Sequence, residues 1–400
     1  MVNIIIVGSG AGGATVAQTL SKNPKNNITI IEAGPQANVQ ESYKYYKSWD
    51  YESIEILSTK LVGGSTTVIA GNMIPTLVTE LMINGIDINP QLHSLEDELD
   101  IVPLPLKHTK KGTQKLIDAS KKLGLHMGRM PKAINSDKCI NCGKCALGCP
   151  MNAKWSSIRF IKEAVVENAK LITDTPVIGL IVEDNKIRGV KTKNNTYTAD
   201  IVILAAGALN TPLLLQDIGI DAGHNLFVDP FVTIGGVLRD INQIEEVSMN
   251  ALLDLNGIVI SPHYSGILEK KVEKFGAKKE DILSLMVKIK DENKGTVKNG
   301  FIHKGVSSDD IALLSRGTGI AGSILVEAGV DPETIVSTQA RGAHPGGTAA
   351  IGDIVDSNLM TEVEGLYVSD ASVLPVAPGA PPLLTIMALA RRLGEYINSL

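Results

Sequence analysis

The pattern of apolar and polar positions predicts an α/β fold that starts with a strand, a helix and a second strand. An apolar run covers residues 3–7, a helical stretch rich in small residues covers 12–21, and a second apolar run covers 28–32. Two strands joined in this way lie parallel, with a right-handed crossover. The chain is therefore expected to begin with the core of a parallel sheet.

The next part of the chain predicts helices and a hairpin. Residues 36–60 are polar and predict irregular structure, and residues 61–75 predict a buried loop that opens a helix. The periodicity predicts helices near 91–99, 112–123 and 155–168. Alternating or apolar segments predict a hairpin and a return to the first sheet over 177–182, 187–192 and 201–205.

A different block lies between residues 231 and 339. It predicts strands near 232–238, 258–263 and 283–290, and helices near 308–314 and 317–328. The remaining C-terminal segment is rich in Gly and Pro and ends in an amphipathic helix over 382–399. We therefore expect a second, sheet-based unit that precedes a C-terminal return to the first.

Composition and charge argue against several classes of function. The 400 residues carry 38 Lys and Arg against 43 Asp and Glu, a formal net charge of −5. This balance gives no electrostatic reason to bind nucleic acid or an anionic membrane. No apolar run reaches the ~18 residues of a membrane span, and the first strand leaves no room for a secretory leader. We therefore expect a cytoplasmic globular protein with two or three structural units.

A glycine-rich turn after the first strand indicates a dinucleotide site. Gly8, Gly10 and Gly13 form G-x-G-x-x-G at the start of the predicted helix. The first glycine allows a tight turn, the second lets backbone N–H groups approach a pyrophosphate, and the third allows close helix–strand packing. Glu32 lies about 20 positions further on, where an acid binds a ribose. The following Ala33-Gly34 favours FAD over NAD.

Other segments resemble a known family. They are Leu61-Val62-Gly63-Gly64-Ser65-Thr66 with Gly71-Asn72, Leu204-Ala205-Ala206-Gly207-Ala208, His344-Pro345-Gly346-Gly347-Thr348, and residues 365–375 with Leu384-Thr385. In this order they resemble the glucose–methanol–choline (GMC) family of FAD oxidoreductases. The resemblance implies a discontinuous, Rossmann-like FAD-binding domain with a smaller, sheet-based α+β substrate domain. The FAD-binding domain would comprise residues 1–90, 158–230 and 340–400, the substrate domain 231–339, a helical cap or linker 91–138, and a cysteine-rich loop 139–157.

The resemblance also implies a reaction and a site. GMC enzymes oxidise a CH–OH group of a small molecule: a base takes the hydroxyl proton while hydride passes to the flavin. His344 matches the family's catalytic histidine, and Asn72 is a further candidate. The residues expected to contact FAD are Gly8, Gly10, Ala11, Gly13, Glu32, Ala33, Gly34, Gly63, Gly64, Ser65, Asn72, Ala206, Gly207, Asp370, Ala371 and Thr385.

Two positions depart from the family pattern. The second catalytic residue, a His or Asn before the last helix, falls at Pro381, which has no side-chain donor or acceptor. Asp229 precedes a proline where many relatives have His-Pro. Either ordinary alcohol oxidation is lost, or the second role passes to another group, for which Asn72, His224 and His263 are candidates.

All four cysteines lie in one short motif that predicts an iron–sulfur cluster. Cys139, Cys142, Cys145 and Cys149 form C-x2-C-x2-C-x3-C followed by proline, which is the ferredoxin spacing. Because there is only one such run, either all four cysteines hold one [4Fe–4S] cluster or three hold a [3Fe–4S] cluster. A structural zinc site is the competing interpretation, although zinc sites usually separate two C-x2-C pairs by a longer spacer.

A cluster beside a flavin changes the expected reaction, because it passes electrons singly to a carrier. We expect a dehydrogenase that delivers electrons to a ferredoxin or another one-electron carrier. The alternatives are a ferredoxin-linked reductase of a carbonyl or alkene, an electron-transfer subunit without substrate chemistry, and a zinc-containing oxidase that uses oxygen. Lys138, Lys144 and Lys154 would suit an acidic carrier or form an ordinary solvated face. The substrate and the oligomeric state stay open.

Overall fold

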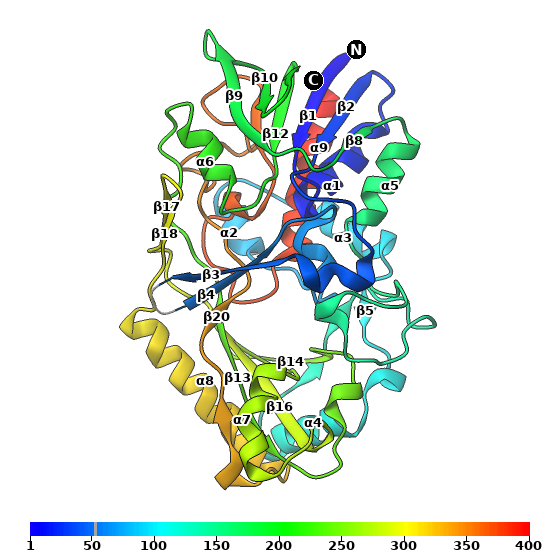
Figure 1. The fold of residues 1–400 in the computed structure, drawn as a ribbon, viewed down its shortest axis with the longest axis vertical. Helices are drawn as coiled ribbons and strands as arrows, with labels where there is room; N and C mark the ends of the chain where they lie inside the picture. Colours follow the sequence, from blue (N-terminus) through cyan, green and yellow to red (C-terminus); the bar gives the residue numbers. More distant parts are fainter. Residues whose placement is uncertain (52–53) are drawn as a thin grey trace.

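The computed structural model describes residues 1–51 and 54–400, and its two main sheets lie toward opposite ends of the molecule (Figure 1). The first sheet has five parallel strands in the order β21-β12-β1-β2-β8. They are β1 (Val2–Val7), β2 (Asn26–Ile31), β8 (Lys170–Ile172), β12 (Ile201–Leu204) and β21 (Leu366–Val368). The predicted α/β class and the parallel strand–helix–strand start are confirmed.

Helices bury this sheet. Helix α1 (Ala11–Ser21) packs against α9 (Leu383–Ser399) and α5 (Ile158–Val166), and α9 also contacts α3 (Asn89–Glu98). Small residues allow this close approach: a Cβ at Gly394 of α9 would lie 2.7 Å from Thr19 Cβ of α1. The short helices α2 (Val78–Ile83) and α6 (Thr211–Gln216) complete this end. The predicted hairpin forms a separate three-stranded sheet of β9 (Val177–Glu183), β10 (Lys186–Thr192) and β11 (Thr196–Thr198).

The second sheet has nine strands, with the order β3-β4-β20-β13-β16-β15-β14-β6 and with β19 paired to β13. Its long central strands are β13 (Pro230–Val237), β15 (Ile258–Pro262) and β16 (Ile282–Ile289). The others are β3 (Tyr46–Tyr51), β4 (Ile54–Thr59), β6 (Gly128–Arg129), β14 (Ala251–Asp254), β19 (Val336–Ser337) and β20 (Arg341–Gly342).

The two faces of the second sheet differ in kind. Alternate residues of β16, from Leu283 to Ile289, join a core with side chains of α4 (Lys111–Lys122) and α8 (Ser308–Glu327). Because side chains alternate along a strand, Met286 and Lys288 project from the opposite face. That face also carries Phe231, since Phe231 and Lys288 are directly paired in the antiparallel β13–β16 ladder. Helix α7 (Gly266–Val272) packs near the end of β13.

Three sequence-based expectations are wrong. Residues 46–59 belong to the β3–β4 hairpin and not to irregular structure, although positions 52–53 of this stretch lie outside the described residues. The loop at 61–75 is mostly buried, but it contains a 3₁₀ turn, Gly64–Val68, and the next helix begins only at Val78. The two helices expected at 308–314 and 317–328 are one helix, α8, because Gly317 serves packing: its Cβ would lie 2.5 Å from Val287 Cγ1.

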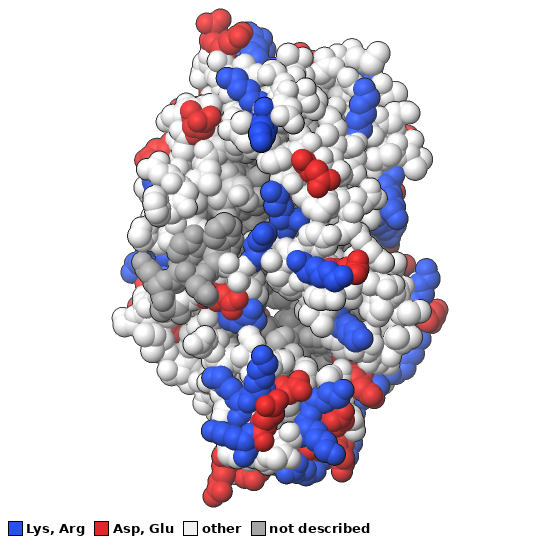
Figure 2. Space-filling model, in the orientation of Figure 1, with Lys and Arg blue, Asp and Glu red and all other residues white. Residues whose placement is uncertain are grey.

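Short strand pairs connect these units. They are β5 (Val102–Pro103) with β7 (Pro131–Lys132) and β17 (Thr296–Lys298) with β18 (Phe301–His303). Basic and acidic side chains are interspersed on the face shown in Figure 2, most densely over the end that holds the second sheet. No helix among the described residues has the length and apolarity needed to cross a membrane.

Candidate active site and cysteine cavity

The glycine turn after β1 has the geometry that a dinucleotide cradle requires. Gly8 has φ +107°, and a Cβ there would lie 2.2 Å from Ala205 O of the neighbouring strand end. A Cβ at Gly13 would lie 2.2 Å from Gly8 O, so this position holds α1 against the turn. In contrast, no atom lies within 4 Å of the Cβ position of Gly10. The turn therefore leaves open space at the N-terminus of α1, where N–H groups favour a phosphate.

Glu32, at the end of β2, is buried beside this turn. Its Oε2 accepts hydrogen bonds from Ser9 N (3.0 Å) and Ser9 Oγ (2.7 Å), and its Oε1 accepts one from Gly34 N (2.8 Å). Burial raises the pKa of this carboxyl above its usual value, while these hydrogen bonds act in the opposite direction. Ala33 follows, half-buried. The carboxylate is thus fixed at the expected end of the sheet, and its contact with a ribose stays a prediction.

Residues from distant segments converge on the same turn. Ser9 Oγ accepts a hydrogen bond from Gly63 N (3.0 Å), and a Cβ at Gly64 would lie 3.1 Å from Gly10 Cα. Asp370 Oδ2 accepts a hydrogen bond from Gly207 N (2.8 Å). The half-buried Ala11, Ala206 and Ala371 pack at the edge of the same apolar core. The open cradle and these glycines fit a bound FAD.

Two predicted cofactor residues have other partners. Ser65 is exposed, with its Oγ 3.3 Å from Thr59 Oγ1. Thr385, at the start of α9, is fully buried and exchanges hydrogen bonds with the backbone of Thr76. The side chain of Thr385 therefore holds the segment after Asn72 against α9.

His344, whose side chain is 19% exposed, forms a polar trio with the buried Asp229 and Lys288. Its Nδ1 is 2.9 Å from Asp229 Oδ2, and Lys288 Nζ is 3.0 Å from Nδ1 and 3.1 Å from Nε2. Asp229 Oδ1 also accepts a hydrogen bond from Gly379 N (2.9 Å), just before Pro381. A carboxylate therefore reaches the segment where the family has its second His or Asn.

Burial controls the ionisation of the trio. Burial, together with the nearby Lys288 charge, lowers the pKa of His344 well below its usual value. Burial raises the pKa of Asp229 and lowers that of Lys288, while each partner's charge partly offsets the shift of the other. The imidazole is therefore neutral, and its contact with Asp229 is a hydrogen bond from Nδ1–H to a carboxylate.

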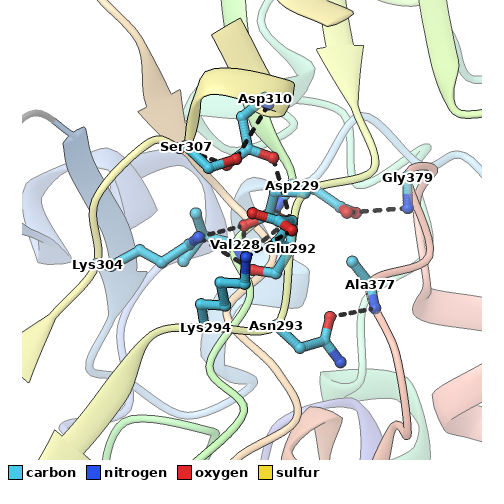
Figure 3. A network of polar contacts seen from close by, with 11 residues as sticks. Val228, Asp229, Glu292, Asn293, Lys294, Lys304, Ser307, Asp310, Ala377 and Gly379 are labelled. Carbon is cyan, nitrogen blue, oxygen red and sulfur yellow. Dashed lines mark hydrogen bonds and ion pairs between the residues drawn. The ribbon is translucent and has the colours of Figure 1, made fainter.

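A second buried network holds Asp229 in place (Figure 3). The Asp291 carboxylate accepts hydrogen bonds from the backbone N–H groups of Asp229 (2.9 Å) and Val228 (3.1 Å). Lys304 Nζ pairs with Asp291 Oδ2 at 3.0 Å, and both side chains are almost completely buried. Asn293 extends the network to the C-terminal segment, because its Oδ1 accepts a hydrogen bond from Ala377 N (3.1 Å). These contacts support the left-handed backbone of Asp229, whose φ is +48°.

The three candidates for the second catalytic role lie in different places. His224 is exposed and pairs with Asp221 at 3.2 Å, away from the trio. His263 is half-buried: its Nδ1 lies 3.0 Å from Thr233 Oγ1 and its ring is edge-on to Phe231. Burial lowers the pKa of His263 to about 4.

Asn72 is buried, but its polar atoms are engaged. Its Oδ1 accepts a hydrogen bond from Lys132 Nζ, and its Nδ2 lies 3.4 Å from Met249 Sδ. None of the three candidates contacts His344 directly. Lys288 does contact His344, but the sequence analysis did not predict it. The available sequence signal was the alternation along the strand, which places Lys288 on the same face as Ser284 and Met286.

All four cysteines line one small cavity of about 20 Å³. The glycines of the loop are required: Cβ atoms at Gly143 and Gly148 would lie 2.1 Å from Ile244 O and 1.9 Å from Val39 O. Ala153 N donates a hydrogen bond to Cys149 Sγ (3.3 Å). The cysteines form no disulfide. No group of three His, Cys, Asp or Glu side chains in the described ranges is placed to hold a single metal ion.

Two buried lysines lie between this cavity and the glycine loops. Lys154 lines the cavity, and its Nζ donates hydrogen bonds to Thr66 O (2.9 Å) and Thr67 O (3.1 Å). Lys132 Nζ donates to Ala70 O (2.8 Å) and to Asn72 Oδ1. The expectation that Lys154 could contact a carrier is therefore wrong, because the residue is only 6% exposed.

Comparison with known proteins places the chain in a family. The family model described as GMC oxidoreductase matches residues 2–240, and its C-terminal counterpart matches 316–390. An uncharacterized protein of Methanocaldococcus jannaschii is 32% identical over 98% of both chains. A long-chain-alcohol oxidase of Arabidopsis thaliana is 25% identical and matches 97% of this chain and 66% of that protein.

Solved structures share the fold. The crystal structure of pyridoxine 4-oxidase from Mesorbium loti matches all of both chains with a TM-score of 0.78 at 16% identity. A formate oxidase of Aspergillus oryzae gives a TM-score of 0.74 over 100% of this chain and 98% of that chain, at 17% identity. The matches confirm the predicted FAD-dependent oxidoreductase acting on CH–OH groups, with a Rossmann-like FAD-binding domain and a sheet-based substrate domain. The chain belongs to the GMC oxidoreductase family.

Proposed function

We propose that this protein oxidises the CH–OH group of a small alcohol and passes the electrons singly, through an iron–sulfur cluster, to a carrier protein. The observation that carries the proposal is the presence of two sites that are connected to the FAD cradle, one through Gly347 and the other through Lys154, which donates to Thr66 O. One is the His344 trio. The loop that carries His344 continues to Gly347, whose N–H donates a hydrogen bond to Ala371 O (3.2 Å), next to Asp370. The other is the cavity lined by the four cysteines.

In this proposal, His344 is the base that removes the hydroxyl proton. Its Nδ1–H donates to Asp229, so the lone pair is on Nε2, which accepts the proton. Lys288 Nζ lies 3.1 Å from Nε2 and donates to it until the substrate hydroxyl takes its place; Lys288 then stabilises the negative charge that develops on the substrate oxygen. FAD, when bound, supplies the hydride acceptor. Asp229 and Lys288 together take over the role that Pro381 has lost.

The residues near the trio favour a substrate with an apolar body. Phe231, Met249 and Met286 form an apolar cluster on the sheet face that carries Lys288. Lys288 Nζ lies 5.8 Å from the centre of the Phe231 ring. Apolar walls around one polar group are typical of sites that orient a single hydroxyl.

The cysteine cavity is proposed to hold one [4Fe–4S] cluster. In a cluster each iron takes its own cysteine, so the four sulfurs need not converge on one point, whereas zinc requires convergence. The four cysteines, in the ferredoxin spacing, line one common cavity, which supports a cluster. A [3Fe–4S] cluster with one spare cysteine is the alternative that iron analysis distinguishes.

A one-electron carrier is proposed as the partner. The cysteine loop exposes three apolar side chains, Ile140, Leu147 and Met151, which are 58%, 50% and 46% exposed. Lys138 and Lys144 are exposed on the same loop. An apolar patch with two cations suits brief contact with an acidic protein such as a ferredoxin.

The test begins with protein purified without oxygen, on which FAD, iron, sulfide and zinc are measured together. We expect FAD with about four iron and four sulfide per chain, and bleaching of the flavin by an alcohol in the absence of oxygen. A Cys145→Ala variant should still be reduced by the alcohol but should no longer reduce a one-electron acceptor. Zinc without sulfide would overturn the electron path, and flavin reduction by reduced carrier alone would favour a reductase.

A further inference from the structure

We propose that Lys132 and Lys154 are buried counter-ions of the anionic centre in the cysteine cavity, and that they raise its reduction potential. Electrons would then move from flavin to cluster, in the direction of substrate oxidation. This inference rests on the proposed function, because it requires a cluster at the four cysteines.

Lys132 is a buried cation. The residue is 1% exposed, and its Nζ donates to three acceptors: Ala70 O, Asn72 Oδ1 and Ser248 O. Burial lowers the pKa of Lys132 to about 7, and the three acceptors match the three N–H donors of its ammonium form. All three acceptors are uncharged, and they therefore solvate the charge without neutralising it.

Lys154 is held in the same way but faces the cavity. Its ammonium donates two hydrogen bonds, to Thr66 O and Thr67 O, and both acceptors lie in the loop next to the flavin cradle. The third N–H of the ammonium has no partner among the described residues, and the side chain lines the cavity with the cysteines. A proton of Lys154 is therefore available to a sulfur atom there.

Neither lysine pairs with a carboxylate within residues 1–51 and 54–400. By contrast, the buried Lys304 has Asp291 at 3.0 Å. A buried charge without a counter-ion costs several kcal/mol, so an anion is needed near Lys132 and Lys154. Burial lowers the pKa of both lysines, and negative charge at the nearby Cys145 would act in the opposite direction. The cysteine centre is the anion that the structure offers.

The charges have a direct consequence for the redox chemistry. Reduction adds one negative charge to the cluster, and nearby buried cations stabilise the reduced form more than the oxidised form. A substrate that loses two electrons gives one proton to His344 and a hydride to the flavin. A cluster held by the four cysteines would take these two electrons one after the other and pass them to two oxidised carriers. A raised potential favours this direction over reduction driven by a low-potential carrier.

The test is a redox titration of the cluster, followed by electron paramagnetic resonance, in Lys154→Met and Lys132→Met. We expect each change to weaken the affinity of the cluster for the electron about tenfold. For a one-electron couple this corresponds to a midpoint potential that is about 59 mV lower. Lys144→Met is the matched control, because this exposed lysine lies on the same loop and water screens its charge. Lys154→Arg, which keeps the charge, should restore the potential.

Each outcome decides between defined alternatives. Loss of iron from the two Met variants, with FAD retained and with full iron in Lys144→Met, would also support the counter-ion role. A full cluster with an unchanged potential in both Met variants would overturn the inference and leave the proposed function intact. Unaltered protein without iron and sulfide would overturn the proposed function together with the inference.

Discussion

Asp229 Oδ2 lies 2.9 Å from His344 Nδ1, and the other oxygen of the same carboxylate accepts a hydrogen bond from Gly379 N. One carboxylate thus joins His344, the proposed base, to the segment before α9, where Pro381 occupies the position at which we expected a second His or Asn. The carboxylate fixes the tautomer of His344. The first predictions concern this pair.

Replacing either member of the pair should reduce substrate oxidation. His344→Ala removes the proposed base, and we expect the rate of flavin reduction by an alcohol to fall by roughly 10²–10⁴-fold. Asp229→Asn should also lower this rate, because an amide no longer selects the Nδ1–H tautomer. Asp221→Asn is the control: this exposed residue pairs with His224 and Lys298 and should have no effect. Equal rates in His344→Ala and unaltered enzyme would exclude His344 as the base.

The pH dependence of flavin reduction should have two limbs. Burial raises the pKa of Asp229, so the carboxylate needed by His344 is lost on acidification closer to neutrality than for an ordinary Asp. Burial lowers the pKa of Lys288, so its positive charge is lost on alkalinisation earlier than for an ordinary Lys. A bell-shaped profile is therefore expected.

Variants assign each limb of this profile. Lys288→Met should remove the alkaline limb and lower the maximum, whereas Asp229→Asn should remove the acid limb. Rapid-mixing measurements of flavin bleaching across pH provide the profiles, with FAD content checked for each variant. An alkaline limb that persists in Lys288→Met would show that another group carries it.

The buried pair Lys304–Asp291 should stabilise the fold only as long as both partners are present. Lys304→Met leaves the Asp291 carboxylate buried without its cation, and this should lower the free energy of unfolding by about 3–5 kcal/mol. Lys294→Met breaks an exposed pair with Glu292 and should cost at most about 1 kcal/mol. Urea unfolding of the two variants gives the comparison. Similar losses would mean that Lys304 contributes no more than a surface charge.

The sequence predicted the parts of the site that depend on local motifs. Gly8 to Gly13 follows a strand and opens a helix, and His344 lies in a glycine-rich segment, so both could be recognised without long-range contacts. Lys132, Lys154 and Lys288 could not, because lysine is almost always exposed and the partners that bury these three are distant in sequence. Asn72 and Lys132, for example, are joined by an isolated β-bridge across 60 positions.

Fold errors had the same cause. The β3–β4 hairpin contains polar residues that predict a loop, but β4 pairs with β20, so the sheet stabilises the strands. The boundaries suggested for the domains stay predictions, yet β3 and β4 join the second sheet although they lie in the segment 1–90 assigned to FAD binding. Contacts between distant segments decide such elements, and a single sequence does not reveal them.

Gly317 and Gly319 of α8 offer a matched test of why the predicted helix break is wrong. A Cβ at Gly317 would lie 2.5 Å from Val287 Cγ1, whereas no atom lies within 4 Å of the Cβ position of Gly319. Gly317→Ala should therefore destabilise the protein by about 1–3 kcal/mol through overpacking against β16. Gly319→Ala should stabilise it by up to ~1 kcal/mol, because alanine favours a helix over glycine. Opposite shifts of the unfolding midpoint in urea would support this account, and stabilisation by both changes would mean that Gly317 is not needed for packing.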